Sequence, residues 1–166
     1  RRQRQMCIRD SFYTSNVTNM EDMFWQTGWS ALESINLGDK FDTSNVTNMS
    51  WMFASLGIRK MTSLDLGDKF DTSNVTIMDQ MFWQTGGNSM ESLNLGNKFD
   101  TSKVKNMYQM FCNTGHSKLK SLDLGDKFDT SNVTNMNGMF IDTGEYAMTT
   151  LDLGPAFTKI ADTNTD

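Results

Sequence analysis

Acidic side chains recur at a fixed interval along the chain and are its first candidates for chemistry. Stacked carboxylates repel one another, and Ca²⁺, which prefers oxygen ligands, would relieve that repulsion. Lysines run beside one acidic column and can balance it, and asparagine alternates with aspartate in the other. We therefore expect solvated or turn-forming carboxylates here in preference to a metal site. The alternating column is Asn36, Asp65, Asn94, Asp123 and Asp152, and the balanced column is Asp39, Asp68, Asn97 and Asp126, beside Lys40, Lys69, Lys98 and Lys127.

Threonine recurs at the same interval, at Thr14, Thr43, Thr72, Thr101 and Thr130. Regular ranks of threonine on a flat surface are typical of ice-binding faces. The same hydroxyls can instead cap a helix or bond the backbone of a neighbouring repeat. Each of them lies within a turn-forming string, so we favour the structural role. Ice binding and cation binding stay the weaker alternatives.

Aromatic residues at variable positions of the repeat are the best candidates for a binding site. Trp25 and Trp83 share a column that is otherwise filled by smaller residues, and Trp29 and Trp51 lie at other variable positions. Exposed tryptophan is enriched at binding hot spots, although the rings could also simply cover one side of the repeat. We predict ligand binding by the large variable residues, which are Trp25, Trp29, Trp51, Trp83, Arg59, Tyr108, His116 and Tyr146.

No set of residues suggests catalysis. His116 is the single histidine, so a His-based metal site or an acid–base dyad is not expected. Cys7 and Cys112 lie several repeats apart, beyond the roughly 7 Å that a disulfide allows between Cα atoms, and we expect two free thiols. The net charge of −5 argues against nucleic acid as a partner. We predict no cofactor and, without a long apolar run, no membrane span.

These residues are positioned by a 29-residue repeat. The string FDTSNVTNM and its variants begin at Phe12, Phe41, Phe70, Phe99 and Phe128. A fixed period in this range indicates a solenoid, in which residues 29 positions apart contact one another in neighbouring layers. We read residues 1–5 as a basic N-terminal tail, 6–157 as a single solenoid domain and 158–166 as a C-terminal tail.

One unit of the repeat predicts a strand, a turn, a short helix and a loop. Leu32, Ile35 and Leu37 form an L-x-x-L-x-L strand pattern, which Gly38 ends. The apolar residues Val46, Met49, Met52 and Phe53 are spaced for one face of a short helix. Because Val46 and Thr47 are β-branched, they could instead be extended, with the helix confined to about Asn48–Ser55. A glycine cap follows at Gly57. The expected fold is an α/β, leucine-rich-repeat-like solenoid of about five coils, with a parallel β-sheet on one side and short helices or turns on the other.

The string FDTSNVTNM, followed by x-x-M-F and then S-L-D-L, resembles the BspA-type leucine-rich repeats of bacterial surface proteins, the lipoprotein-type repeat. The resemblance covers the chain from Met6 to about Phe157. Thr27-Gly28 and Thr85-Gly86 stand where the family often has Gly-Cys, and the unit is longer than usual. Both departures lie in the loop before the strand. The resemblance implies a secreted or surface-anchored protein that adheres to other molecules without catalysis.

The sequence therefore predicts a non-catalytic scaffold at the cell surface that recognises a protein or glycan ligand. The alternative is a structural unit that associates end to end, because the ends of a strand stack expose unpaired edges, although Pro155 blunts one of them. Asn16, Asn45, Asn74 and Asn132 lie in N-V-T, an N-glycosylation pattern that repetition of a structural motif explains equally well.

Overall fold

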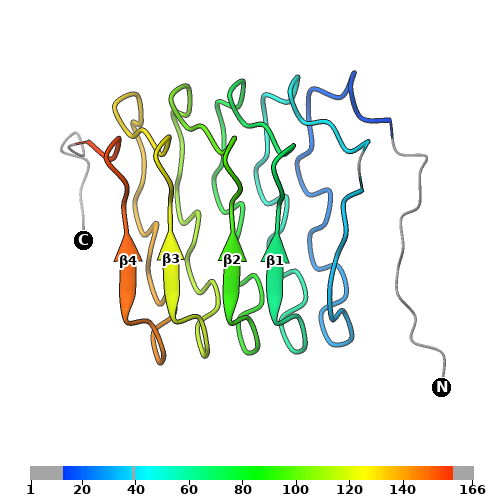
Figure 1. Ribbon diagram of the computed structural model, residues 1–166, viewed down its shortest axis with the longest axis vertical. Coiled ribbons are helices and arrows are strands. Elements are labelled where there is room, and N and C mark those ends of the chain that lie inside the picture. The colour runs from blue at the N-terminus through cyan, green and yellow to red at the C-terminus, as the bar shows by residue number, and fades with distance from the viewer. Residues whose placement is uncertain (1–12, 39, 159–166) are drawn as a thin grey trace.

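A computed structural model describes residues 13–38 and 40–158 of the chain. These residues form five coils stacked side by side (Figure 1). The coils follow the sequence repeat and are numbered here from the N-terminal end. Coil 1 covers residues 13–40, coil 2 covers 41–69, coil 3 covers 70–98, coil 4 covers 99–127 and coil 5 covers 128–156.

Four three-residue strands lie in a row along one side of the stack (Figure 1). They are β1 (Ser63–Asp65), β2 (Ser92–Asn94), β3 (Ser121–Asp123) and β4 (Thr150–Asp152). β1 pairs with β2 and β3 pairs with β4, both in parallel. In β1, β2 and β3 the central leucine is buried and its neighbours are exposed, which is the predicted alternation.

The register that the repeat predicts is confirmed. Leu64 pairs with Leu93, and Leu122 pairs with Leu151, each 29 positions further along the chain. A second column of parallel bridges links all five coils on another side, through Asn19, Asn48, Ile77, Asn106 and Asn135. Each coil is therefore superposed on the next.

The predicted α/β solenoid is nevertheless wrong in its secondary structure. The described residues contain no helix, and their strands form only two two-stranded sheets. The segment Asn48–Ser55, expected to be helical, consists of a bridge residue followed by turns. With no helix among the described residues, none is available there to cross a membrane.

The backbone explains why the helix is absent. Trp51 and Ser55 have left-handed φ angles of 58° and 56°, which a right-handed helix excludes. Alternate amides bond across to the next coil, as when Phe53 N–H donates to the carbonyl of Met81 at 2.9 Å. The intervening amides bond three residues back, as from Ala54 to Trp51 at 2.9 Å. An α-helix would need every amide to bond four residues back within its own coil.

The core consists of side chains stacked from coil to coil. Phe53 is fully buried and lies between Phe24 and Phe82, with ring centroids 5.5 and 5.6 Å away and nearly parallel planes. A second row, which includes Phe41 and Phe70, packs against the first. Buried valine, methionine and leucine side chains complete this core. Full burial of such side chains contributes about 1.5–3 kcal/mol each.

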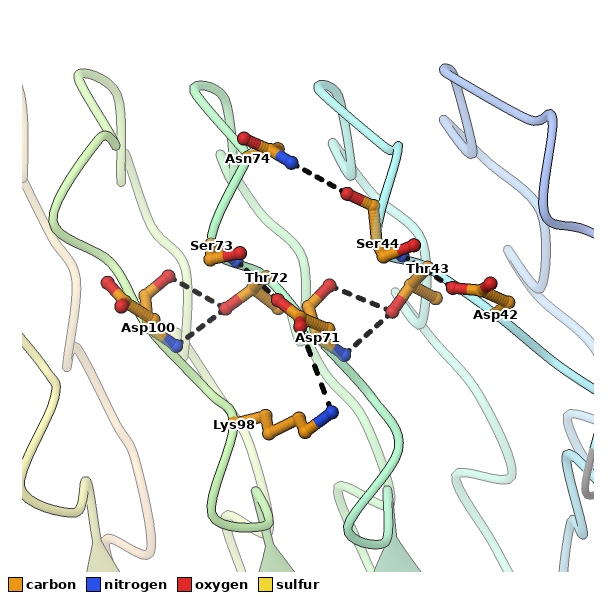
Figure 2. Close-up of polar contacts among 9 residues, drawn as sticks. All are labelled: Asp42, Thr43, Ser44, Asp71, Thr72, Ser73, Asn74, Lys98 and Asp100. Atoms are coloured by element: carbon orange, nitrogen blue, oxygen red, sulfur yellow. Dashed lines mark hydrogen bonds and ion pairs between the residues drawn. The ribbon is translucent and has the colours of Figure 1, made fainter.

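The threonine column joins the coils on the inside (Figure 2). The hydroxyl of Thr43 donates to the carbonyl of Asp71 in the next coil and accepts from its amide, both at 2.8 Å. The Asp71 carboxylate in turn accepts the amide of Ser73. Thr43 and Thr72 are fully buried. The prediction that these hydroxyls bond the neighbouring coil is confirmed.

The strand side of the stack is not uniform, because its coils approach one another in pairs. Gly67, Gly96, Gly125 and Gly154 all have left-handed φ angles of 71–78°. A Cβ on Gly96 would lie 2.3 Å from the Gly67 carbonyl oxygen, and one on Gly154 would lie 2.1 Å from that of Gly125. A Cβ on Gly67 or Gly125 would meet nothing within 4 Å. Coils 2 and 3, and coils 4 and 5, are thus closely joined, with a looser seam between β2 and β3.

Candidate functional site

Three tryptophans from successive coils form a continuous row, here called the tryptophan row. The ring centroid of Trp51 lies 6.3 Å from that of Trp25 in an edge-on arrangement, and 5.7 Å from that of Trp83. Trp25 is 46% exposed, and Trp51 and Trp83 are half-buried. Stacked coils bring these side chains together although they occupy two different columns of the repeat. The row is a rigid surface that combines apolar ring faces with indole N–H donors.

Trp51 occupies a backbone position that disfavours large side chains. Its φ is 58°, and the equivalent residues of the other coils are also left-handed, with φ angles of 50–65° at Asp22, Gln80, Gln109 and Gly138. A left-handed conformation costs a residue with a side chain roughly 1–2 kcal/mol. The other four coils carry Asp22, Gln80, Gln109 and Gly138 there; aspartate and glycine are among the types that tolerate this conformation best, and glutamine is less bulky than tryptophan. The tryptophan in coil 2 is therefore not the residue that the backbone prefers.

Trp29 and His116, two more of the predicted ligand-binding residues, line one hollow of about 210 Å³ in the surface. We call this the Gly87 hollow, after the glycine that occupies the same column of the repeat as Trp29 and His116. Its other lining residues are Ile58, Gln84, Gly87, Asn88 and Asn113. Coils 1 to 4 all contribute to it, so its shape depends on the stack as a whole.

His116 is held at one side of this hollow by residues of coil 5. Its Nδ1 lies 3.2 Å from the Asp142 carbonyl oxygen and 3.3 Å from the Glu145 carboxylate. The ring of Tyr146 meets the imidazole edge-on, with centroids 4.9 Å apart. Tyr146 itself is 73% exposed. These contacts fix the orientation of the imidazole.

Arg59 and Tyr108 lie on the surface without joining the row. Arg59 is tied to Trp29 through the backbone, its amide donating to the Trp29 carbonyl at 3.2 Å, and its side chain is exposed. Tyr108 is 37% exposed, and among the described residues no ring contact connects it to Trp51 or Trp83. The predicted binding residues thus divide into the tryptophan row, the Gly87 hollow with Tyr146 beside it, and two separate positions.

The repeated polar columns have structural partners. Asp65, like Asn36 and Asp123, accepts the amide hydrogen bond of the glycine two residues further on. The amide of Asn94 donates to the Asp65 carboxylate at 3.0 Å. Within residues 13–38 and 40–158 no group of three or more His, Cys, Asp or Glu side chains is arranged to hold a metal ion. Asp39 and Cys7 lie outside the described residues.

The amides of the N-V-T strings also bond within the stack. Asn45, Asn74 and Asn132 each donate to the carbonyl of a serine in the preceding coil, at 2.7–2.8 Å. Cys112 is buried and free, and burial raises the pKa of its thiol. A buried, largely protonated thiol is a poor nucleophile.

Sequence reasoning found the aromatic residues but missed the hollow and the pairing of coils. A signal for the pairing exists, because the chain also repeats every 58 residues. The string FWQTG occupies 24–28 and 82–86, and SLDLG occupies 63–67 and 121–125. The hollow was signalled by Gly87, which interrupts a column that carries Trp29, Ile58 and His116 in the other coils.

The sequence model of one family matches the chain, in two overlapping stretches over residues 3–114 and 57–152. That family is described as "Mycoplasma protein of unknown function, DUF285". No curated protein and no solved structure gives a significant match.

Proposed function

Since the chain belongs to the DUF285 family, for which no function is described, we propose that it is a non-catalytic scaffold that recognises a protein or glycan partner through its tryptophan row. The observation that carries the proposal is the continuous contact of Trp25, Trp51 and Trp83 on the surface of three coils. Large, preorganised aromatic surfaces lose little conformational entropy on binding, and they dominate binding energy where they become buried.

The fold does not require these rings. The column of Trp25 and Trp83 is filled by Ala54, Cys112 and Ile141 in the other coils, and all five coils superpose. Trp51 replaces residues better suited to a left-handed backbone. Rings that are dispensable for packing, that gather on one surface and that stay partly exposed support a role in binding.

The repeated polar side chains support the absence of catalysis. The hydroxyls of Thr43 and Thr72 and the carboxylate of Asp71 are engaged by backbone groups of neighbouring residues. A catalytic group must instead reach a substrate with a free acceptor or donor. The remaining candidate, His116, has a carboxylate and a carbonyl as partners and no nucleophile within its contacts.

A surface location follows from the resemblance of the repeat to BspA-type surface proteins, and we include it in the proposal. A stack that binds through one exposed face suits a protein displayed outside the cell. The location is testable by protease shaving of intact cells that express the protein: release of fragments reactive with an antibody to the repeat is expected. Complete protection of the repeat until the cells are lysed would contradict a surface location.

The binding role is testable with the row itself. Immobilised protein is screened against extracellular matrix proteins and a glycan array, and each hit is remeasured with the double variant Trp25→Ala/Trp83→Ala. We expect affinity to fall at least about tenfold, the loss typical of truncating one hot-spot residue. Ile141→Ala is the matched control, since Ile141 shares the column of Trp25 and Trp83 but lies in coil 5. If the hits bind the double variant as tightly as the wild type, the row is rejected as the binding site.

End-to-end association is a second candidate, favoured by one observation. All three residues of β4 are exposed, and the apolar Leu151 is 41% exposed at its centre. An exposed strand with an apolar side chain is a ready surface for pairing with another copy. Light scattering across protein concentration tests this: a mass that rises with concentration in the wild type but not in Leu151→Lys supports association, and a constant monomer mass rejects it.

A further inference from the structure

The Gly87 hollow exists because one coil lacks a side chain that the others carry. In this column coil 1 has Trp29, coil 2 has Ile58 and coil 4 has His116, whereas coil 3 has glycine. The backbone at Gly87 is not left-handed, so its conformation does not call for glycine. A Cβ there would meet its nearest neighbour, the Gln84 carbonyl oxygen, at 3.5 Å, which is an ordinary contact. The missing side chain is therefore not demanded by packing.

The lining of the hollow combines an apolar wall with side-chain amides and the imidazole of His116. Trp29 is 42% exposed, and Ile58 beside it is almost wholly buried. Three side-chain amides complete the lining, from Gln84, Asn88 and Asn113. The Asn113 amide donates to the Cys112 sulfur at 3.3 Å, whereas no hydrogen bond to another described residue involves the side-chain amide of Gln84 or Asn88. None of the described lining residues is Lys, Arg, Asp or Glu.

We infer that the Gly87 hollow binds one neutral hexose unit of a glycan. A pyranose ring has an apolar face of C–H groups, which packs on an indole, and hydroxyls that both donate and accept. Side-chain amides match such hydroxyls because each amide carries two donors and an acceptor. The hollow is smaller than the 300–1,000 Å³ typical of pockets for drug-sized ligands, which suits a single sugar ring. The lining offers no Lys or Arg to pair with a phosphate or carboxylate, and the Glu145 carboxylate already lies 3.3 Å from the His116 imidazole, so phosphorylated or carboxylated ligands are disfavoured.

This site deepens the proposed function, on which it rests: it assigns a ligand class to one part of the recognition surface. The tryptophan row offers three ring faces in contact with one another, whereas the hollow has one exposed ring beside three side-chain amides. The row would then contact the bulk of a glycosylated partner, and the hollow would select the sugar. His116, oriented by Glu145 and Tyr146, closes the hollow on the side away from Trp29.

The site is tested by saturation-transfer NMR with the full chain. The probes are the methyl glycosides of glucose, galactose, mannose and N-acetylglucosamine at millimolar concentration, with methyl glucuronide as the charged comparator. We expect transfer to the ring protons of at least one neutral glycoside and little to the glucuronide. Gly87→Ile, which restores the residue type of coil 2, should abolish that transfer, and Trp29→Ala should weaken binding at least about fivefold.

Ile141→Ala is the control, because it removes an exposed apolar side chain of coil 5 that lies outside both the hollow and the tryptophan row, and it should retain transfer. Thermal unfolding of Gly87→Ile identifies a folding defect, and if that variant is destabilised Gly87→Ala is used in its place. The inference is overturned if no neutral glycoside shows transfer, if the glucuronide binds equally well, or if a folded Gly87 variant binds like the wild type. If one of these results is obtained but a partner's binding still depends on Trp25 and Trp83, only the sugar site is rejected and the proposed function stands.

Discussion

The hydroxyl of Thr72 holds the backbone of Asp100 in the next coil by two hydrogen bonds, donating to its carbonyl oxygen and accepting from its amide, both at 2.7 Å. Thr72→Val keeps the shape of the side chain but leaves the carbonyl and the amide without this partner inside the stack. We expect the free energy of unfolding to fall by about 2–4 kcal/mol, since each unpaired buried group costs about 1–3 kcal/mol. Urea denaturation followed by circular dichroism measures the change. Thr72→Ser keeps the hydroxyl and should lose much less; equal losses in both variants would mean that the hydroxyl is unimportant.

The pairing of coils on the strand side predicts different outcomes for two similar glycines. Gly67 and Gly96 have nearly the same left-handed φ, 72° and 76°, so Gly67→Ala and Gly96→Ala incur the same backbone cost of about 1 kcal/mol. Only the new methyl of Gly96→Ala meets a carbonyl oxygen at 2.3 Å. We expect Gly96→Ala to lower the free energy of unfolding by about 1–3 kcal/mol more than Gly67→Ala. Chemical denaturation of the two variants checks this, and indistinguishable midpoints would argue against paired coils.

Two aromatic residues of coil 2, Trp51 and Phe53, should separate stability from binding. Phe53 is fully buried between two other phenylalanines, and Phe53→Ala should cost about 3–5 kcal/mol of stability. Trp51→Gln introduces the residue that coil 3 carries at the same left-handed position, and should cost about 1 kcal/mol or less. Thermal unfolding and partner capture are measured on both variants. A Trp51→Gln protein that is as unstable as Phe53→Ala would assign Trp51 to the core instead of the binding surface.

The thiol of Cys112 should respond to alkaline pH in a defined direction. Burial raises its pKa in the folded chain, so the unfolded chain releases this proton at a lower pH. The contribution of the thiol to stability is therefore complete below its ordinary pKa of about 8.5 and declines as pH rises above that value. In a Cys7→Ser background we expect slow labelling by iodoacetamide at pH 8 and rapid labelling once urea unfolds the chain. Equally fast labelling of the folded protein would show that the thiol is accessible.

The repeat length predicted the register of the coils, but not their secondary structure. Val46, Met49 and Met52 were expected on one face of a helix, and all three are fully buried. A spacing of three is also that of successive turns whose amides bond three residues back, and Met52 bonds Met49 in this way. The choice between the two is made by hydrogen bonds to a neighbouring coil, which a single repeat unit does not encode. The left-handed angles at Trp51 and Ser55 were similarly invisible, because neither residue type demands them.

The candidate site was partly visible in the sequence. Trp25 and Trp83 are distinctive in the sequence because their column otherwise holds small or aliphatic residues. Their joint contact with Trp51 required knowing how a different column lies against theirs in three dimensions. The hollow was harder to predict, since it is marked by an absent side chain at Gly87.

Alternate amides of each coil bond the next coil, as Met49 bonds Ile77 and Phe53 bonds Met81. This arrangement has a mechanical consequence for the stack. A pull spread over a whole layer loads these bonds in parallel, so that they resist together, whereas a pull on one chain end breaks them in succession and peels the layers apart. The direction of an applied force would therefore determine how large a load the stack withstands.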